Sequence, residues 1–147
     1  MVSKGDKFGV DKSQIYVGGG SAGGHLAAAV AMIPSKSIMQ APAGMLLFNP
    51  GVDIGRSAQI QGLFRNKAVQ YSPIEYVRPS LPGAWIVHGK ADEVVPYSTV
   101  VDFCQRMVSA GNLCKLLGFD GAGHGFFNAR RPAHDEVLGA LLVHLDP

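Results

Sequence analysis

The stretch Gly18-Gly19-Gly20-Ser21-Ala22-Gly23-Gly24-His25 follows an apolar run, Ile15-Tyr16-Val17, and precedes an alanine-rich run from Leu26 to Ile33. A few β-forming residues, then glycines, then good helix formers are typical of a strand that turns sharply into a helix. The one hydroxyl at the corner of that turn belongs to Ser21.

The residues around the serine have the spacing G-x-S-x-G, formed by Gly19, Ser21 and Gly23. A side chain two positions before or after the serine is expected to collide with the neighbouring strand or helix. The same turn puts the amide of Ala22 at a helix N-terminus, where it can donate to a developing oxyanion. One loop would then supply both a nucleophile and an oxyanion donor.

The same glycines permit a second interpretation. Gly18, Gly20 and Gly23 also fit G-x-G-x-x-G, the pattern of a dinucleotide-binding turn. A nucleotide-binding oxidoreductase should carry an acidic residue about 20 positions further on, at the end of the second strand. Here Phe48 is followed by Asn49-Pro50, and Asp53 comes later, which disfavours this alternative.

Composition limits the classes of partner. The 147 residues suffice for one core that buries about 70% of the unfolded surface. Charged residues make up 16%, the net charge is +2, and the Lys and Arg residues are scattered, so we expect no nucleic-acid partner. The first residues are polar and no apolar run approaches 18 residues, so we expect no membrane association, no signal peptide and a cytoplasmic location.

The chain has two cysteines, Cys104 and Cys114. They form no C-x-x-C pair, and no histidine stands beside them at the spacing of a zinc site. We expect two buried thiols in a reducing compartment rather than a disulfide.

Strand-like and helix-like segments alternate along the chain. We predict strands over 14–18, 43–48, 84–88 and 113–119, and helices over 22–33, 97–110 and 133–145. Residues 51–80 are interpreted as a connection over the top of the sheet, with short helices near 57–64 and 73–77. Successive βα units predict the α/β class: a parallel sheet of about four strands with helices on both faces.

The two later helices have apolar stripes that should face the core. The helix over 97–110 should end at Gly111. Its predicted inner face consists of Val100, Val101, Cys104, Met107 and Val108, and that of the last helix of Val137, Leu138, Leu141, Leu142 and Leu145.

Three of the predicted strands are followed by residues that suit acyl transfer. Ser21 follows the first strand, Asp92 the third and His124 the fourth. Ligands of parallel α/β sheets bind beyond the carboxyl ends of the strands. A nucleophile, an acid and a base in that chain order therefore indicate one site at that edge.

Four segments together resemble the α/β-hydrolase superfamily, within it the bacterial carboxylesterases and acetyl esterases near the hormone-sensitive-lipase-like group. They are Gly-Gly-Ser-Ala-Gly-Gly-His (19–25), Leu-Phe-Asn-Pro (47–50), His-Gly-Lys-Ala-Asp-Glu-Val-Val-Pro (88–96) and Gly-His-Gly-Phe-Phe-Asn (123–128). The resemblance implies hydrolysis of small acyl esters through an acyl-enzyme, with no metal or organic cofactor. It implies Ser21 as nucleophile, Asp92 as acid, His124 as base and Ala22 as oxyanion donor.

Other residues remain alternatives at this stage. Glu93 or Asp120 could replace Asp92 as the acid, although the family pattern H-G-x-x-D-x-x-V-P fits Asp92. The remaining histidines are expected to be packing or surface residues: His25, His88, His134 and His144.

The chain departs from the family in one large respect. A full α/β hydrolase has several strands before the nucleophile strand and a His-Gly-Gly-Gly motif with further oxyanion amides. We therefore expect residues 1–147 to be a single domain corresponding to the C-terminal part of such an enzyme, with weak catalysis. The strand over 14–18 would be an exposed apolar edge, which predicts a homodimer or higher oligomer that covers it.

Three classes of function stay open. A serine esterase is favoured, and within catalysis a serine peptidase of the prolyl-oligopeptidase type is disfavoured because Ala22 stands where an aromatic residue is usual. The nucleotide-binding oxidoreductase is the second class. A catalytically silent fragment or scaffold is the third.

Overall fold

The computed structural model describes residues 7–34, 41–56, 62, 67–128 and 134–145. Its centre is a sheet of four strands that follow one another in the order β1-β2-β3-β4. Every neighbouring pair is parallel. The strands are β1 (Tyr16–Gly20), β2 (Gly44–Phe48), β3 (Gly83–Gly89) and β4 (Cys114–Phe119).

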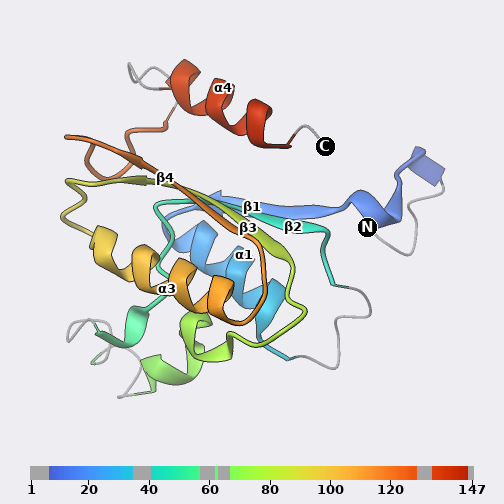
Figure 1. The fold of residues 1–147 in the computed structure, drawn as a ribbon, viewed down its shortest axis with the longest axis horizontal. Helices are drawn as coiled ribbons and strands as arrows, with labels where there is room; N and C mark the ends of the chain where they lie inside the picture. The colour runs from blue at the N-terminus through green and yellow to red at the C-terminus, as the bar shows by residue number, and fades with distance from the viewer. Residues whose placement is uncertain (1–6, 35–40, 57–61, 63–66, 129–133, 146–147) are drawn as a thin grey trace.

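Three helices cover the two faces of this sheet (Figure 1). The helices α1 (Ala22–Met32) and α3 (Tyr97–Ser109) lie on one face, and α4 (His134–Leu145) lies on the other. The parallel sheet with helices on both faces is thus confirmed. Because all four strands run in one direction, their carboxyl ends, and the loops that follow them, share one edge.

The first strand lies two residues later than predicted. Gln14 belongs to a short 3-10 helix, η2 (Lys12–Gln14), whose N-terminus is capped by Asp11: Oδ1 accepts from the backbone N–H of Ser13 at 2.8 Å. Pairing with β2 then begins at Tyr16 and continues to Gly20, opposite Phe48. The strand therefore ends directly before Ser21.

The connection between β2 and β3 contains 3-10 helices: η3 (Ile54–Arg56), η4 (Ala68–Tyr71) and η5 (Pro73–Tyr76). The η5 helix is the one predicted near 73–77, and the helix predicted over 57–64 falls, apart from Gly62, outside the described residues. The later part of the connection does not lie over the strand ends as expected. Instead η5 packs on α1, beneath the helical layer (Figure 1).

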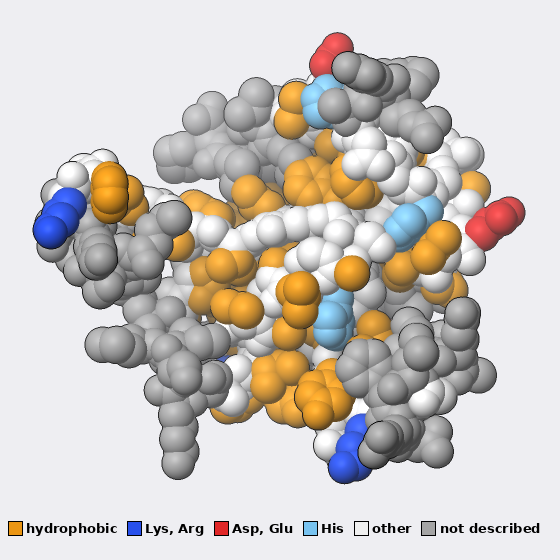
Figure 2. Space-filling model, turned by 180° about the vertical axis from the view of Figure 1, so that it is seen from behind, with side chains coloured by type: hydrophobic (Ala, Val, Ile, Leu, Met, Phe, Trp, Pro, Cys, Tyr) orange, Lys and Arg blue, Asp and Glu red, His pale blue; other side chains and the backbone are white. Residues whose placement is uncertain are grey.

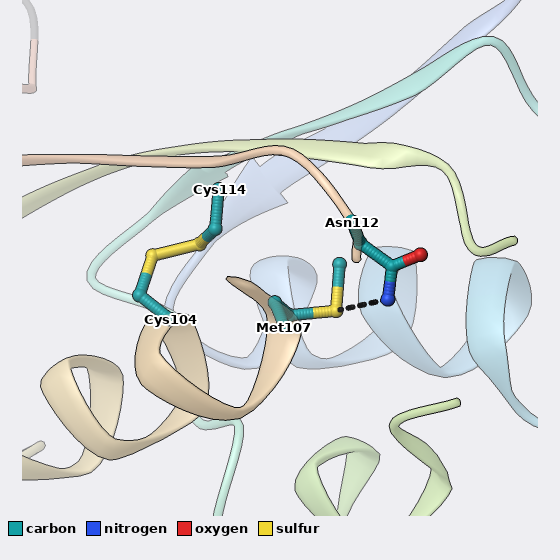
Figure 3. Close-up of a disulfide and its surroundings, with 4 residues drawn as sticks. All are labelled: Cys104, Met107, Asn112 and Cys114. Atoms are coloured by element: carbon teal, nitrogen blue, oxygen red, sulfur yellow. Dashed lines mark hydrogen bonds between the residues drawn. A yellow bond between two sulfur atoms is a disulfide. The ribbon is translucent and has the colours of Figure 1, made fainter. Parts of the chain in front are cut away.

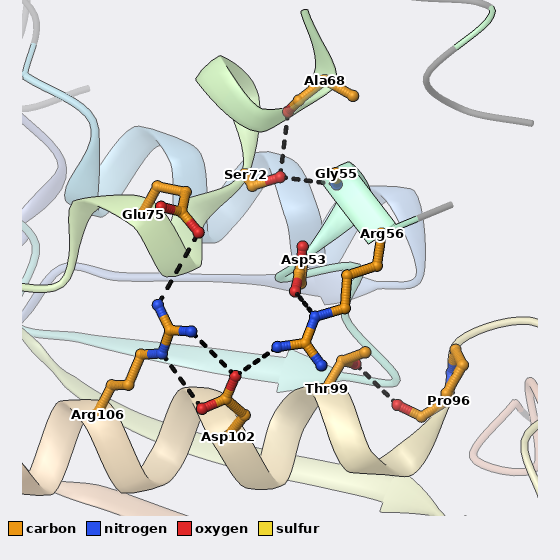
Figure 4. Close-up of polar contacts among 10 residues, drawn as sticks. All are labelled: Asp53, Gly55, Arg56, Ala68, Ser72, Glu75, Pro96, Thr99, Asp102 and Arg106. Atoms are coloured by element: carbon orange, nitrogen blue, oxygen red, sulfur yellow. Dashed lines mark hydrogen bonds and ion pairs between the residues drawn. The ribbon is translucent and has the colours of Figure 1, made fainter. Parts of the chain in front are cut away.

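Ion pairs join this connection to α3 (Figure 4). Arg56 contacts Asp53 at 2.6 Å and Asp102 of α3 at 2.8 Å. Arg106 contacts the same Asp102 at 3.1 Å and Glu75 of η5 at 3.9 Å. Since the side chains of Arg56 and Arg106 are 55% and 44% exposed, these pairs should add little to the stability of the fold.

The main core lies between the sheet and the helices α1 and α3. Its fully buried members include Ala28, Met32, Met45, Leu47, Ile86, Val100, Phe103 and Met107. The inner face of α3 differs in part from the prediction: Val101 is only half-buried and Val108 is 59% exposed, whereas Phe103 is buried. At 100° per residue, positions 100, 103, 104 and 107 form the stripe, and positions 101 and 108 lie at its flank.

The helix α3 ends where the sequence predicts. Gly111 ends α3 with φ +80°, and its N–H donates to the carbonyl of Val108 at 2.9 Å.

On the opposite face of the sheet, Val137 of α4 is buried beside Phe126. Leu138 of the predicted stripe is instead 45% exposed. The side chains of Leu141, Leu142 and Leu145 lie outside the described residues.

The two cysteines form a disulfide, so the expectation of two free thiols is wrong (Figure 3). Cys104 on the inner face of α3 lies over Cys114, the first residue of β4, with a Cα–Cα distance of 5.4 Å. The turn at Gly111 reverses the direction of the chain, so that β4 runs back along the last turns of α3. This brings Cys114 next to Cys104.

Candidate active site

Ser21 lies at the corner between β1 and α1, as the G-x-S-x-G spacing predicts. Its backbone has φ 53° and ψ −118°, a region that residues other than glycine rarely adopt. The N–H of Ser21 donates to the carbonyl of Phe48 at 2.8 Å, which ties the corner to the end of β2. Because α1 begins at Ala22, the amides of its first turn are free of helical partners and point toward the same edge.

The steric demand of the corner differs from the expectation at one glycine. A Cβ at Gly19 would lie 2.7 Å from the carbonyl carbon of Gly23, so no side chain fits there. A Cβ at Gly23 would meet no atom within 4 Å of the described residues. The glycine required on the helix side is Gly24, whose Cβ would lie 2.9 Å from both the Gly19 carbonyl oxygen and the Pro50 ring.

The structure brings Ser21, Asp92 and His124 together in one chain of hydrogen bonds. The Oγ atom of Ser21 lies 2.8 Å from Nε2 of His124, and Nδ1 of His124 lies 2.8 Å from Oδ2 of Asp92. A carboxylate only accepts, so Nδ1 carries the proton and Nε2 is free to accept from the serine hydroxyl. This is the geometry in which an imidazole can take a proton from a serine.

Asp92 is buried, and donors surround its carboxylate. Oδ1 accepts from the amides of Val94 and Val95, each at 2.8 Å. Burial raises the pKa of Asp92, but the Val95 amide, His124 and the Val94 amide together more than offset this, and the pKa lies below its ordinary value. The carboxylate is therefore held ionised, ready to stabilise a charged imidazole.

Two buried side chains next to Asp92 were not singled out from the sequence as parts of a site. Asn49 donates from Nδ2 to Oδ2 of Asp92 at 2.6 Å. His88 was expected to pack, and its ring is indeed fully buried, but its Nε2 lies 3.3 Å from the same oxygen. The signal that could have found Asn49 is its place directly after a buried strand, at the edge where ligands bind.

His88 is held in its neutral form. Its Nε2 donates to the carbonyl of Val95 at 2.9 Å, and the ring meets Tyr97 edge to face. Burial lowers the pKa of His88, and this outweighs the opposing effects of the Val95 carbonyl and Asp92. Its buried Nδ1 has no hydrogen-bond partner among the described residues.

The alternative acids lie away from His124. Glu93 is exposed, and the side chain of Asp120 is 89% exposed and pairs with Lys90 at 2.9 Å. Of the other histidines, Nδ1 of His25 bonds the Gly51 carbonyl at 2.9 Å, and Nδ1 of His134 bonds the Phe127 carbonyl at 3.0 Å. The side chain of His144 lies outside the described residues.

Aromatic packing fixes the loop that carries His124. Phe126 is buried against Phe119, and Phe127 lies against Phe48, with ring centroids 5.0 and 5.2 Å apart. The Phe127 ring also covers Gly20, where a Cβ would lie 2.7 Å from its Cζ atom. The glycine before the serine thus makes room for the ring that anchors the histidine loop.

A cavity of about 340 Å³ lies between the segment after β2 and the loop after β3. Its walls come from residues that directly follow Asn49-Pro50 and Asp92, together with the start of α3. They are Gly51, Asp53, Ile54, Arg56, Val94, Val95, Pro96, Ser98 and Thr99. The volume lies at the lower end of the range found for small-molecule pockets.

Neither a metal cluster nor a membrane span is found in the part of the chain that the structure describes. No group of three His, Cys, Asp or Glu side chains there could hold a metal ion. No helix of the described residues is both long and apolar enough to cross a bilayer.

The parallel strand order, the strained serine at a strand-to-helix corner and the bonded histidine define an α/β protein of the hydrolase type. Comparison with known proteins agrees: the model of a family described as "alpha/beta hydrolase fold" matches residues 1–75. The chain belongs to the α/β-hydrolase family, which confirms the resemblance drawn from its motifs.

Solved structures of an esterase from the Planctomycetes species Thermogutta terrifontis are similar over nearly the whole chain. The native esterase superposes with a TM-score of 0.87 at 32% identity, over 98% of this chain and 58% of that one. The butyrate-bound form gives 0.84 at 33%, covering 98% and 61%. The form phosphorylated by paraoxon gives 0.83 at 34%, covering 98% and 57%.

The chain thus spans about three-fifths of the length of these solved structures. Among curated proteins, none matches it at a significant level.

Proposed function

We propose that this chain carries the catalytic residues of a serine esterase that hydrolyses small acyl esters. The observation that supports this most is the continuous hydrogen-bond chain from Ser21 through His124 to Asp92. The strained backbone at Ser21 and its place at the carboxyl edge of the sheet add to it.

In the first half-reaction, the oxygen of Ser21 attacks the ester carbonyl while Nε2 of His124 takes the serine proton. The charged imidazole donates from Nδ1 to the ionised Asp92. As the tetrahedral intermediate collapses, the carbon–oxygen bond to the alcohol breaks. His124 gives its proton to the departing alkoxide, and the acyl group stays on Ser21.

In the second half-reaction, His124 takes a proton from water, whose oxygen attacks the acyl carbon. The acid leaves, and Ser21 regains its proton. In both halves the Ala22 amide would donate to the oxyanion. One such donor typically contributes about 100- to 1,000-fold to turnover.

One observation supports small acyl groups of the acetyl type. The similar esterase from Thermogutta terrifontis has been solved with propionate and with butyrate bound. We infer that acids of two to four carbons suit this chain as well.

The test is hydrolysis of p-nitrophenyl acetate and p-nitrophenyl butyrate by the purified chain and by Ser21→Ala. A matched control is Ser13→Ala, because Ser13 is an exposed serine whose hydroxyl bonds only Asp11 in the structure. We expect wild type and Ser13→Ala to hydrolyse both esters and Ser21→Ala to match the buffer rate. Paraoxon should add a diethylphosphoryl group to the peptide that contains Ser21. Equal background rates in all three proteins, with no label, would favour the catalytically silent alternative.

We further propose that a second copy of this chain covers the edge of β1. In the described residues β1 is paired only with β2, so its other side leaves backbone groups open. Beside it, apolar side chains gather over β1 and α1 (Figure 2). They line a hollow of about 310 Å³ formed by Val17, Gly18, Gly23, Leu26, Ala27 and Val30. Two such edges can pair antiparallel about a two-fold axis, which gives each copy the same contacts.

The location of the protein in the cell is a separate proposal. The expected cytoplasmic location stays a prediction, and it has an opposing observation in the Cys104–Cys114 disulfide. Disulfides persist in oxidising compartments and are rare in the cytosol. The state of these cysteines in protein taken directly from cells under alkylating conditions would decide between the two compartments.

A further inference from the structure

Asn49 makes polar contacts on three sides although it is completely buried. Its backbone N–H donates to the carbonyl of Val87 at 2.8 Å. Its Oδ1 accepts from the amide of Gly89 at 3.2 Å, and its Nδ2 donates to Oδ2 of Asp92 at 2.6 Å. The side chain therefore bridges the end of β3 and the carboxylate on the loop that follows it.

The contacts explain why this position carries asparagine. The backbone has φ +42°, a left-handed conformation that asparagine tolerates better than most residues. The side chain must also accept from a backbone amide with one atom and donate to a carboxylate with the other. An aspartate of the same shape could donate only when protonated, and an alanine could do neither.

We propose that Asn49 is a positioning residue for the acid of the triad. It holds the Asp92 carboxylate in the orientation in which Oδ2 accepts a hydrogen bond from Nδ1 of His124. The argument rests on the proposed function above. Oδ1 of Asp92 is already held by the Val94 and Val95 amides, so Asn49 supplies the corresponding restraint on Oδ2. It also takes up part of the negative charge that Asp92 presents to His124.

The titratable groups that face Asp92 in the described residues come from β3 and from the loop after β4. His88 of β3 and His124 of the loop after β4 lie against its carboxylate. Tyr97 of α3 lies against the His88 ring and not against Asp92. Since Asn49 itself does not titrate, its replacement changes the surroundings of Asp92 without adding or removing a proton.

The first variant is Asn49→Gly, because glycine adopts φ +42° without strain. Loss of one hydrogen bond to a charged group should lower kcat by about tenfold per active site titrated with paraoxon, with KM within twofold of wild type. The matched control is Asn112→Ala. Asn112 is a buried asparagine that bonds the backbone at Leu81 and Arg78, and its loss should lower stability but leave kcat per titrated site unchanged.

The second variant, Asn49→Asp, separates positioning from a purely structural role. Its side chain keeps the size of asparagine but can donate to Asp92 only while protonated. The ratio of its kcat to that of wild type should therefore fall as the pH rises from about 5 to 8. A ratio that does not change with pH, together with a kcat of Asn49→Gly within twofold of wild type, would overturn the proposal.

A spectroscopic measurement keeps this proposal distinct from the proposed function. The proton between Nδ1 of His124 and Asp92 should give a downfield proton resonance, which can be recorded in a protein without turnover. We expect that resonance to be shifted or lost in Asn49→Gly and unchanged in Asn112→Ala. If wild type shows no hydrolysis that depends on Ser21, the esterase proposal fails while this measurement still tests Asn49. An unchanged resonance in Asn49→Gly counts against Asn49 alone.

Discussion

The ring of His124 lies 2.8 Å from the hydroxyl of Ser21, although 103 positions separate the two residues in the chain. Each side chain follows its own parallel strand, β4 and β1, and among the described residues these strands are the two outer members of the sheet. The loop of His124 therefore reaches across the carboxyl ends of β2 and β3 to meet the serine. Aromatic packing of Phe126 and Phe127 holds it there.

Asp92→Asn should retain the fold and lose most of the activity. In a serine protease with the same arrangement, the corresponding change lowers kcat about 10⁴-fold because the imidazole takes the wrong tautomer. We expect a loss of that order in p-nitrophenyl acetate hydrolysis, with an unchanged circular dichroism spectrum. Asp120→Asn is the control, since the side chain of Asp120 is 89% exposed and pairs with Lys90. A larger loss in Asp120→Asn than in Asp92→Asn would identify Asp120 as the acid.

Two neighbouring glycines should respond oppositely to alanine. Gly24→Ala should destabilise the protein by about 1 to 3 kcal/mol, because its Cβ would press on Gly19 and Pro50 at 2.9 Å. Gly23→Ala meets no described atom within 4 Å and should raise stability by up to about 1 kcal/mol, since alanine favours a helix. Urea unfolding of both variants measures the difference. Equal destabilisation would show that the corner requires Gly23 as well.

The disulfide between Cys104 and Cys114 should stabilise the chain by about 2 to 3 kcal/mol, the value expected for a closed loop of about ten residues. Dithiothreitol should therefore lower the midpoint of urea unfolding in wild type. The double variant Cys104→Ser with Cys114→Ser provides the control, because the reductant should leave its midpoint unchanged. Two titratable thiols in unreduced, denatured wild type would contradict the pairing.

Stability should fall as the pH drops below about 6.5. Burial lowers the pKa of His88 in the folded chain below its ordinary value of 6.5, so the unfolded chain binds the proton more readily. The stabilisation from neutral His88 is complete above pH 6.5 and is lost as the pH falls through the folded value. Urea unfolding at pH 7.5 and pH 5.5 should show the loss, and His88→Gln should reduce it. An equal loss in both proteins would assign the effect to other groups.

A charge in the hollow beside β1 should prevent association of two copies. Leu26 is 63% exposed there, so Leu26→Glu should leave the fold intact and shift the species seen by light scattering to a monomer. Val108→Glu is a matched control, because Val108 is 59% exposed on α3 and does not line this hollow. A wild type that is monomeric at micromolar concentration would rule out the second copy as the occupant of this edge.

Local patterns predicted most of the fold because each strand and helix has its own signal. The run Gly44–Phe48 is continuously apolar and is bounded by Asn49-Pro50, so its strand follows from composition. Gly111 ends α3 as predicted, because its backbone has φ +80°, a left-handed conformation that favours glycine. The predicted first strand began two residues too early. The conformational preference of Gln14 does not distinguish a 3-10 turn from the start of a strand.

The inner face of α3 shows where such patterns stop. Val101 and Val108 are as apolar as Val100, yet Val108 is exposed. Which flank of an apolar stripe is covered depends on what packs beside the helix, and this is a long-range property. The same holds for the two glycines of the corner. Among the described residues, a Cβ at Gly24 would press on neighbouring atoms, whereas a Cβ at Gly23 would meet none.

The sequence by itself determined the order of strands and helices and the three side chains that follow strand ends, because turn chemistry and hydrophobic periodicity act over a few residues. Only the tertiary structure decided the contacts between loops that are distant in the chain. It paired Cys104 with Cys114, separated Asp92 from Asp120, and placed Asn49 against the Asp92 carboxylate. Those choices depend on distances of a few ångströms between packed strands, and no local pattern encodes such distances.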